Sequence, residues 1–179
     1  PGWHVEDTAI AEKYLGQHFI LSKKALDLMI ATAEIKTSDN IVEIGPGLGT
    51  LTTGLAKTGA KIIAVEKDPL MIEILQETLF DFRNQRFPRF RKSDVKIIHA
   101  DARQLLISEI NSFGDKMGIK IGKEGYKIVA NLPYSAATFL IREWLESENP
   151  PQMMVLMIQK EVAQRIVAAP PRMHLLAAS

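Results

Sequence analysis

A four-residue stretch, Asn131-Leu132-Pro133-Tyr134, follows directly on the apolar run 128–130 and carries the groups needed to hold a planar amine. The side-chain carbonyl of Asn131 and the main-chain carbonyl of Leu132 can each accept one amine hydrogen. Proline fixes φ and has no N–H, so Pro133 stiffens the direction of the Leu132 carbonyl. The ring of Tyr134 can stack on a base, as enzymes that act on extruded bases require.

These four residues suit methyl transfer to the exocyclic amine of adenine. That amine is a poor nucleophile because its lone pair is delocalised into the ring. Catalysis must therefore come mainly from placement against a methyl donor, with hydrogen bonds that turn the lone pair out of the ring plane. Asn131, Leu132, Pro133 and Tyr134 are the predicted catalytic residues. An ordinary proline-containing loop after a strand has a similar composition, so the stretch alone leaves both interpretations open.

A glycine-rich turn follows the first apolar strand and favours a nucleoside site. Residues 41–44 are typical of a buried strand, and Gly45, Gly47 and Gly49 precede a helical pattern that opens at Thr50. Such a turn lets the backbone approach a nucleoside closely. The dinucleotide-binding fingerprint needs its third glycine one residue later. The spacing therefore favours a methyltransferase over a dehydrogenase, for which the chain also offers no evident hydride-transfer histidine.

Two acidic residues end two further predicted strands. Residues 61–65 end at Glu66, whose carboxylate can accept both hydroxyls of a ribose. Residues 95–100 end at Asp101, where an acid can accept the adenine amine of S-adenosylmethionine. Each acid alone fits a solvated strand end, but three strand ends that suit one ligand favour a common site. We therefore expect a cofactor site at the carboxyl ends of these strands.

Strands and helices alternate along the chain, which predicts an α/β fold with a doubly wound, mostly parallel sheet. A fourth strand is expected over residues 128–130 and a fifth over 153–158. Leu70, Ile74 and Leu75 are expected to form the buried stripe of the third helix, and Trp144 to pack in the core. Helices are expected at about residues 22–36, 50–59, 68–80, 105–113, 137–146 and 160–168.

The composition suits one globular domain. The 179 residues are 46% hydrophobic, which allows a sizeable core, and no stretch approaches the roughly 18 apolar residues of a membrane span. The chain has no cysteine, which excludes disulfides and thiolate chemistry and fits a reducing compartment. Its N-terminal segment is acidic and lacks arginine, unlike a transit peptide or a secretion signal. We expect a cytoplasmic protein.

Basic residues concentrate in the second half of the chain. Residues 1–80 hold 7 basic and 11 acidic side chains and residues 81–179 hold 15 and 10, giving net charges of −4 and +5. The densest basic segment interleaves its cations with Phe87, Pro88 and Phe90, a composition suited to phosphate contact and base stacking. A solvated loop with tucked phenylalanines fits it as well. The candidate RNA-binding residues are Arg83, Arg86, Arg89, Arg91 and Lys92.

Four motifs resemble, in order and spacing, the small-subunit ribosomal RNA adenine N6-dimethyltransferases, a family of class I methyltransferases that use S-adenosylmethionine. The resemblance implies a Rossmann-like class I fold, with a leader over residues 1–14 and a cofactor-binding catalytic domain over 15–179. The motifs are Leu15-Gly16-Gln17-His18-Phe19-Ile20, Glu43-Ile44-Gly45-Pro46-Gly47-Leu48-Gly49, Asn131-Leu132-Pro133-Tyr134 and Gln159-Lys160-Glu161-Val162.

The resemblance implies roles for the matched residues. The N-terminal segment would close over the cofactor through Gln17, His18 and Ile20, although many relatives carry asparagine where this chain has His18. The full set of implied cofactor contacts is Gln17, His18, Ile20, Gly45, Gly47, Gly49, Glu66, Lys67, Asp101, Ala102 and Asn131.

Within that set, the residues at the strand ends would divide the cofactor among them. Gly45 would approach the methionine part, Glu66 the ribose and Asp101 the adenine. Asn131 would contact both the cofactor and the target amine.

The implied reaction is in-line methyl transfer from the sulfonium to adenine N6, repeated to dimethylate two adjacent adenines near the 3′ end of small-subunit ribosomal RNA. No metal is required. The implied partner is the immature small ribosomal subunit, bound by a monomer without membrane association and serving subunit biogenesis. Relatives continue beyond Ser179 with further strands, a small helical domain and a second aromatic opposite Tyr134. The chain is therefore expected to lack the last strands of the sheet.

Two alternatives stay open. Large-subunit RNA adenine methyltransferases of the macrolide-resistance type share the architecture, but they commonly carry isoleucine where this chain has Leu132. A non-catalytic ribosome-assembly or RNA-binding factor could keep the fold without the chemistry. The intact Asn131 and Tyr134 argue against that second alternative.

Overall fold

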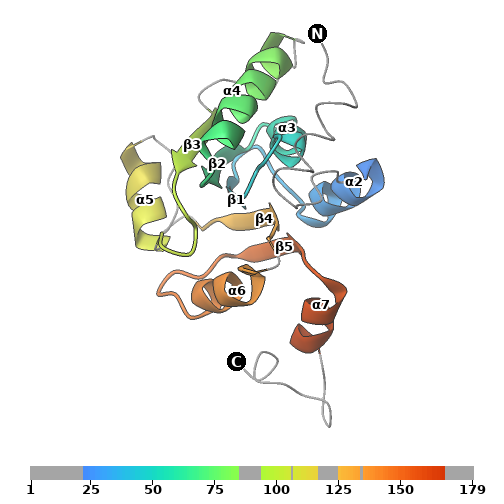
Figure 1. Ribbon diagram of the computed structural model, residues 1–179, viewed down its shortest axis with the longest axis vertical. Helices are drawn as coiled ribbons and strands as arrows, with labels where there is room; N and C mark the ends of the chain where they lie inside the picture. The colour runs from blue at the N-terminus through green and yellow to red at the C-terminus, as the bar shows by residue number, and fades with distance from the viewer. Residues whose placement is uncertain (1–21, 85–93, 106, 117–124, 134, 168–179) are drawn as a thin grey trace.

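The computed structural model describes residues 22–84, 94–105, 107–116, 125–133 and 135–167. Five strands form one sheet in the order β3-β2-β1-β4-β5, and each neighbouring pair is parallel (Figure 1). This order confirms the predicted doubly wound α/β fold. The strands are β1 (Asn40–Ile44), β2 (Lys61–Glu66), β3 (Val95–His99), β4 (Lys127–Asn131) and β5 (Met153–Met157).

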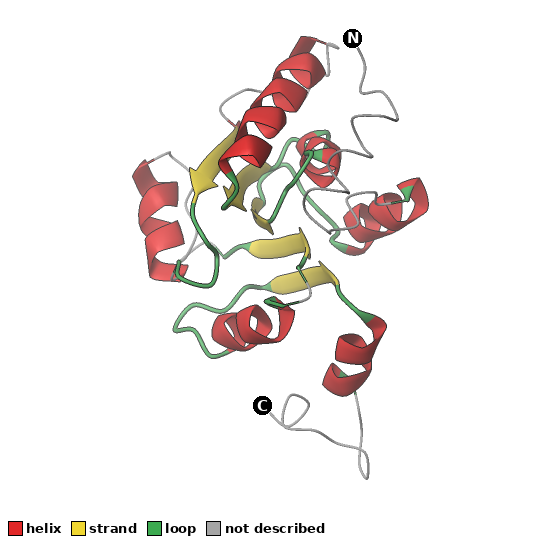
Figure 2. Cartoon of the chain, in the orientation of Figure 1, coloured by secondary structure: helices red, strands yellow, loops and turns green. Residues whose placement is uncertain are grey.

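Helices cover both faces of this sheet (Figure 2). One buried cluster joins Leu55 and Val129, and the other joins Leu140 and Ile128, so neighbouring residues of β4 point to opposite faces. None of the helices described here is both long and apolar enough to cross a membrane. The first face is covered by α2 (Lys23–Thr32), α3 (Thr50–Ala56) and α4 (Pro69–Asn84), the second by α5 (Ile107–Lys116) and α6 (Ala137–Leu145), and α7 (Lys160–Ile166) follows β5.

The central strands are apolar because both of their faces are covered. All five residues of β1 are buried, as are the last five of β2. Parallel strands between two helical layers have continuous apolar sequences rather than alternating ones, and this pattern made the strands predictable. The edge strand β5 differs, since each of its residues is only half-buried.

Local signals set the starts of two helices as predicted. Ser22 Oγ accepts a hydrogen bond from Ala25 N (3.2 Å) and caps α2. Asp68 Oδ1 accepts from Leu70 N (2.9 Å) and caps α4, whose first residue is Pro69. Gly59, with φ +81°, lies three residues beyond the end of α3 at Ala56, so the helix stops earlier than the glycine predicted.

Several predictions about the helices need correction. The helix α2 ends at Thr32 rather than near Lys36, and Ile74 of the predicted stripe on α4 is only half-buried. The helix α4 runs to Asn84 rather than Phe80, and α5 spans residues 107–116 rather than 105–113. Leu75 is buried as predicted, but Leu70 is 56% exposed. Met71 is buried instead. It lies four residues before Leu75 and therefore on the same face of α4, the face that is turned toward the sheet. Trp144, 3% exposed, packs in the core as predicted.

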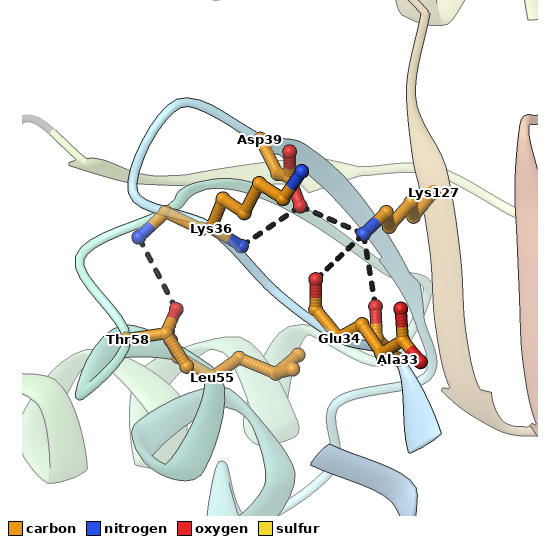
Figure 3. A network of polar contacts seen from close by, with 8 residues as sticks. Ala33, Glu34, Lys36, Asp39, Leu55, Thr58 and Lys127 are labelled. Carbon is orange, nitrogen blue, oxygen red and sulfur yellow. Dashed lines mark hydrogen bonds and ion pairs between the residues drawn. The ribbon is translucent and has the colours of Figure 1, made fainter. Parts of the chain in front are cut away.

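A polar network closes the amino-terminal edge of the sheet (Figure 3). Lys127 Nζ donates to the carbonyl oxygens of Ala33 and Glu34, each at 2.9 Å, and lies 2.8 Å from Asp39 Oδ2. Asp39 Oδ2 also accepts from Lys36 N at 2.9 Å. The network ties the connection between α2 and β1 to the start of β4.

Candidate functional site

The carboxyl ends of β3, β2, β1 and β4 follow one another along a single edge of the sheet. Asp101 follows β3, Glu66 ends β2, the loop 45–49 follows β1, and Asn131 ends β4. Pairing of Ile44 with Val65 brings the loop to the end of β2. In a doubly wound sheet, ligands bind where the strand order changes direction, which here lies between β1 and β4. This edge is the candidate site.

Backbone donors hold the carboxylate of Glu66, which is only 7% exposed. Its Oε1 accepts from the N–H groups of Lys67 (2.8 Å) and Asp68 (3.0 Å), and its Oε2 accepts from Gly47 N (3.3 Å). The last bond joins the end of β2 directly to the glycine loop. Because each carboxylate oxygen offers two lone pairs, Oε2 keeps an acceptor position for a ligand hydroxyl.

The glycine loop, residues 45–49, packs against α4 at Gly49 and has open space at Gly45. Its three glycines all have positive φ, between 53° and 81°. A Cβ at Gly49 would lie 2.6 Å from Leu75 of α4, so no larger residue fits there without a shift. A Cβ at Gly45 would meet nothing within 4 Å. Thr78 Oγ1 of α4 donates to Leu48 O at 3.1 Å and fixes the closed side, which leaves the side of Gly45 accessible to a ligand.

Asp101 is held by its neighbour Arg103. Arg103 Nη2 lies 2.7 Å from Asp101 Oδ2, and Arg103 Nε and main-chain N donate to Oδ1 at 3.2 and 3.0 Å. These hydrogen bonds lower the pKa of Asp101 to about 2. The predicted neighbours Lys67, exposed, and Ala102, half-buried, lie beside the same two strand ends. Sequence reasoning missed Arg103, although an arginine two residues after the acid was a usable signal.

The first three residues of the predicted catalytic stretch form a fixed turn between β4 and α6. Asn131 is half-buried, and Leu132, only 2% exposed, donates its N–H to Met157 O at 3.1 Å. The carbonyl of Pro133 accepts from the N–H groups of Ala136 (3.0 Å) and Ala137 (3.2 Å), which begin the helix. The turn is therefore anchored on both sides.

A buried carboxyl group that the sequence analysis did not single out lies beneath the glycine loop. Glu43 is 1% exposed, and neither of its carboxyl oxygens nor Thr52 Oγ1 has a hydrogen-bond partner in the described part of the chain. Burial raises the pKa of Glu43 to about 8; Thr52 is near enough to oppose this rise, and Glu66 adds to it. A single carboxyl inside an apolar strand was the signal that could have identified it.

Several predicted residues lie outside the described part of the chain and stay predictions. They include three cofactor contacts, the predicted stacking ring and the basic segment, where only the backbone of its first member is described. No three His, Asp or Glu side chains in the described ranges are grouped so that they could hold a metal ion. The residues concerned are Gln17, His18, Ile20, Tyr134, Arg83, Arg86, Arg89, Arg91 and Lys92.

Sequence comparison shows the family to which this chain belongs. A family model described as ribosomal RNA adenine dimethylase matches residues 10–175. The chain is 40% identical over 172 residues to a protein of Dehalococcoides mccartyi named ribosomal RNA small subunit methyltransferase A. That alignment covers 96% of this chain and 53% of the relative, so the chain spans about half the length of the relative.

Solved structures share the fold. A dimethyladenosine transferase from Plasmodium falciparum superposes with a TM-score of 0.65 at 26% identity, over 85% of this chain and 47% of that one. The 23S rRNA methyltransferase ErmE superposes with a TM-score of 0.61 at 22% identity, over 83% of this chain and 50% of that one. The fold of this chain is therefore the class I methyltransferase fold.

Proposed function

We propose, from the premise that this chain belongs to the ribosomal RNA adenine dimethylase family, that it transfers methyl groups from S-adenosylmethionine to adenine N6 in small-subunit ribosomal RNA. One observation carries the proposal: Glu66, bonded to the loop at Gly47, and Asn131 lie on one edge, with the glycine loop between them. A carboxylate for the cofactor and an amide for the target amine thus end the two strands, β2 and β4, that flank β1 and its glycine loop.

The described residues of this edge fit S-adenosylmethionine. The free acceptor position on Glu66 Oε2 suits one ribose hydroxyl, and the open side of Gly45 suits the methionine part. Asp101 is ionised at neutral pH and can only accept, which suits the adenine amine. When bound, the cofactor supplies an electrophilic methyl group on a sulfonium.

The protein's own contribution to the transfer is placement. Neither the amide of Asn131 nor the carbonyl of Leu132 is a base, so they act by accepting the hydrogens of the amine. The turn at Pro133 is hydrogen-bonded to the start of α6, which keeps these acceptors in a fixed direction and avoids the cost of ordering them during the reaction. We assign base stacking to Tyr134 on the sequence pattern alone.

The proposed substrate is an immature small ribosomal subunit. The relative that is 40% identical is named a small subunit methyltransferase, whereas the likeness to the 23S enzyme concerns the fold. The basic segment from Arg83 to Lys92 is the proposed RNA contact, and residues 15–179 the proposed catalytic unit.

The test compares three RNA substrates. The chain is incubated with methyl-labelled S-adenosylmethionine and immature small subunits, mature methylated small subunits, or large-subunit RNA, and the labelled base is mapped. We expect label at adenine N6 in immature small subunits alone. Label confined to large-subunit RNA would overturn the proposed substrate and favour an activity of the macrolide-resistance type. Cofactor binding without label on any RNA would favour the assembly-factor alternative.

A further inference from the structure

Arg103 fills three of the four hydrogen-bond acceptor positions of Asp101, the group that the proposed cofactor site needs. Its Nη2 reaches Oδ2 at 2.7 Å and its Nε reaches Oδ1 at 3.2 Å, so the planar fork engages both carboxylate oxygens. The main-chain N–H of Arg103 donates separately to Oδ1 at 3.0 Å. Asp101 is thus oriented by a backbone bond that can persist and covered by a side chain that can move.

Exposure indicates which of the two side chains a ligand meets first. The side chain of Arg103 is 48% exposed and that of Asp101 only 22% exposed. The guanidinium therefore lies toward solvent relative to the carboxylate. A ligand amine that reaches the carboxylate from solvent therefore meets the guanidinium first, and the acceptor position left on Oδ2 lies beside that group.

We propose that Arg103 is a built-in competitor for adenine: its guanidinium occupies the amine-binding position on Asp101, and the adenine amine of the cofactor displaces it. This inference rests on the proposed function, because it takes Asp101 as the acceptor of the adenine amine. The backbone bond from Arg103 N keeps the carboxylate in place during the exchange. The displaced guanidinium is returned to solvent, where it is well hydrated.

The competition has a small cost and a distinctive dependence on salt. An exposed ion pair contributes at most about 1 kcal/mol, which corresponds to roughly two- to fivefold in the affinity of the competing ligand. Salt screens an exposed pair of charges. The adenine amine is neutral, so salt weakens the competitor more than it weakens the amine contact. Removing the competitor should therefore tighten cofactor binding most at low salt.

The experiment measures calorimetric dissociation constants for S-adenosylhomocysteine at about 50 mM and about 500 mM salt. Arg103→Met is expected to bind about two- to fivefold more tightly than the wild-type chain at low salt, with the difference shrinking at high salt. Arg103→Lys keeps the charge but loses the fork, and is expected to bind with intermediate affinity. Arg142→Met is the matched control, because Arg142 forms an exposed pair with Glu146 at 2.8 Å on α6. It should bind as the wild-type chain does.

Each other result overturns a defined part of the inference. Equal or weaker binding by Arg103→Met would show that the guanidinium supports the site or is irrelevant to it, while the proposed function would stand. If Arg142→Met also bound S-adenosylhomocysteine more tightly, the effect would come from the lower net charge of the chain and not from the pair of Arg103 and Asp101. Failure of every chain, including the wild type, to bind S-adenosylhomocysteine would overturn the proposed cofactor and this inference with it.

Discussion

The two edges of the sheet use polar groups in opposite ways. At the amino edge, the three hydrogens of the Lys127 ammonium meet three oxygens, from Ala33, Glu34 and Asp39, so the network is complete in itself. At the carboxyl edge, Glu66 receives three backbone hydrogen bonds and still keeps an acceptor position. The first arrangement stabilises the fold, and the second leaves capacity for a ligand.

Along one strand, β4, the residue at one end contributes to stability and the residue at the other end to the proposed function. The strand β4 begins at Lys127 and ends at Asn131, so one element has an anchor at one edge and the proposed amine acceptor at the other. Substitutions at its two ends should therefore affect different measurements. The predictions below test that separation.

The largest effect is expected from Asn131→Ala. Loss of one acceptor for the target amine should lower the rate of methyl transfer to immature small subunits by about 100- to 1000-fold, the usual range for removing one such hydrogen bond. The free energy of unfolding should change little, because Asn131 is half-buried at a strand end. Single-turnover transfer and denaturant unfolding measure the two quantities.

The companion variant Asn131→Asp keeps an acceptor oxygen of the same size. It should retain more transfer than the alanine variant if acceptance of the amine hydrogen is what matters. Unchanged transfer in Asn131→Ala would refute the assigned role of Asn131. A large loss of stability in the same variant would contradict the division between the two edges.

The opposite end of β4 is tested by Lys127→Met. The substitution removes the donor of two carbonyl oxygens and the ion-pair partner of Asp39, which keeps only its hydrogen bond from Lys36 N. We expect about 2 kcal/mol of destabilisation, less than the 3–5 kcal/mol typical of breaking a fully buried pair. Cofactor affinity should stay within about twofold. Lys24→Met, at an exposed position on α2, is the control and should unfold like the wild-type chain.

Acid sensitivity sharpens the test of Lys127. Burial alone would raise the pKa of Asp39, but the ammonium of Lys127 and the N–H of Lys36 outweigh it and hold that pKa below 3.8. A lowered pKa in the folded state adds stability above pH 3.8 that is lost as the pH falls below it. Lys127→Met should lose most of this acid-dependent stability. An identical acid profile in the variant would contradict the network.

A smaller effect is expected from Glu66→Gln. The amide keeps one acceptor oxygen but turns an NH2 group toward backbone donors, so affinity for S-adenosylhomocysteine should fall roughly tenfold. An analogue of the ligand that lacks both the 2′- and the 3′-hydroxyl should bind the two chains about equally, because the hydrogen bond from the ribose to residue 66 is then missing from each. Glu77→Gln, exposed on α4, is the matched control. Equal affinity of Glu66→Gln and wild type for the ribose ligand would remove Glu66 from the site.

Much of this division between edges could be predicted from the sequence, because apolar runs locate parallel strands and the residue after each run must lie at the carboxyl edge. Glu66, Asp101 and Asn131 were found in that way. The stripe of α4 was partly wrong, since Leu70 and Met71 offer two overlapping apolar faces and only packing against the sheet selects between them. The pattern of residue types does not show which of the two faces of α4 packs against the sheet.

The contacts between side chains could not be predicted from the sequence, because they too depend on how the elements pack. The pair of Asp101 and Arg103 depends on the turn in which Gln104 and Leu105 donate to the carbonyl of Asp101 and fold the chain back. The burial of Glu43 without a hydrogen-bond partner in the described residues likewise depends on packing between elements. Strand periodicity shows that Glu43 and Glu66 both belong to strands, but not that one has three donors and the other none.

The smallest effect is expected from Glu43→Gln, a change in how the free energy of unfolding depends on pH. The substitution tests a carboxyl group that belongs to neither edge of the sheet. Its pKa of about 8 in the folded chain exceeds the ordinary 4.5, so the folded state retains a proton that the unfolded state releases between these values. Stability therefore falls as the pH rises from about 4.5 to about 8, with no further loss above that range. Glutamine does not titrate, and the variant should lack this slope.

Between pH 7 and pH 8 the wild-type chain should lose about 1 kcal/mol more of its unfolding free energy than Glu43→Gln does. The difference between the two profiles isolates this group, because Asp39 and Asp101 titrate far below this window and Tyr126, with a pKa of about 12, far above it. Thr52→Val removes the hydroxyl that favours the ionised form, so its slope should extend to higher pH. Parallel profiles for wild type and Glu43→Gln would mean that the buried carboxyl is already ionised at neutral pH. In that case a hydrogen-bond donor would balance the charge of Glu43 in solution.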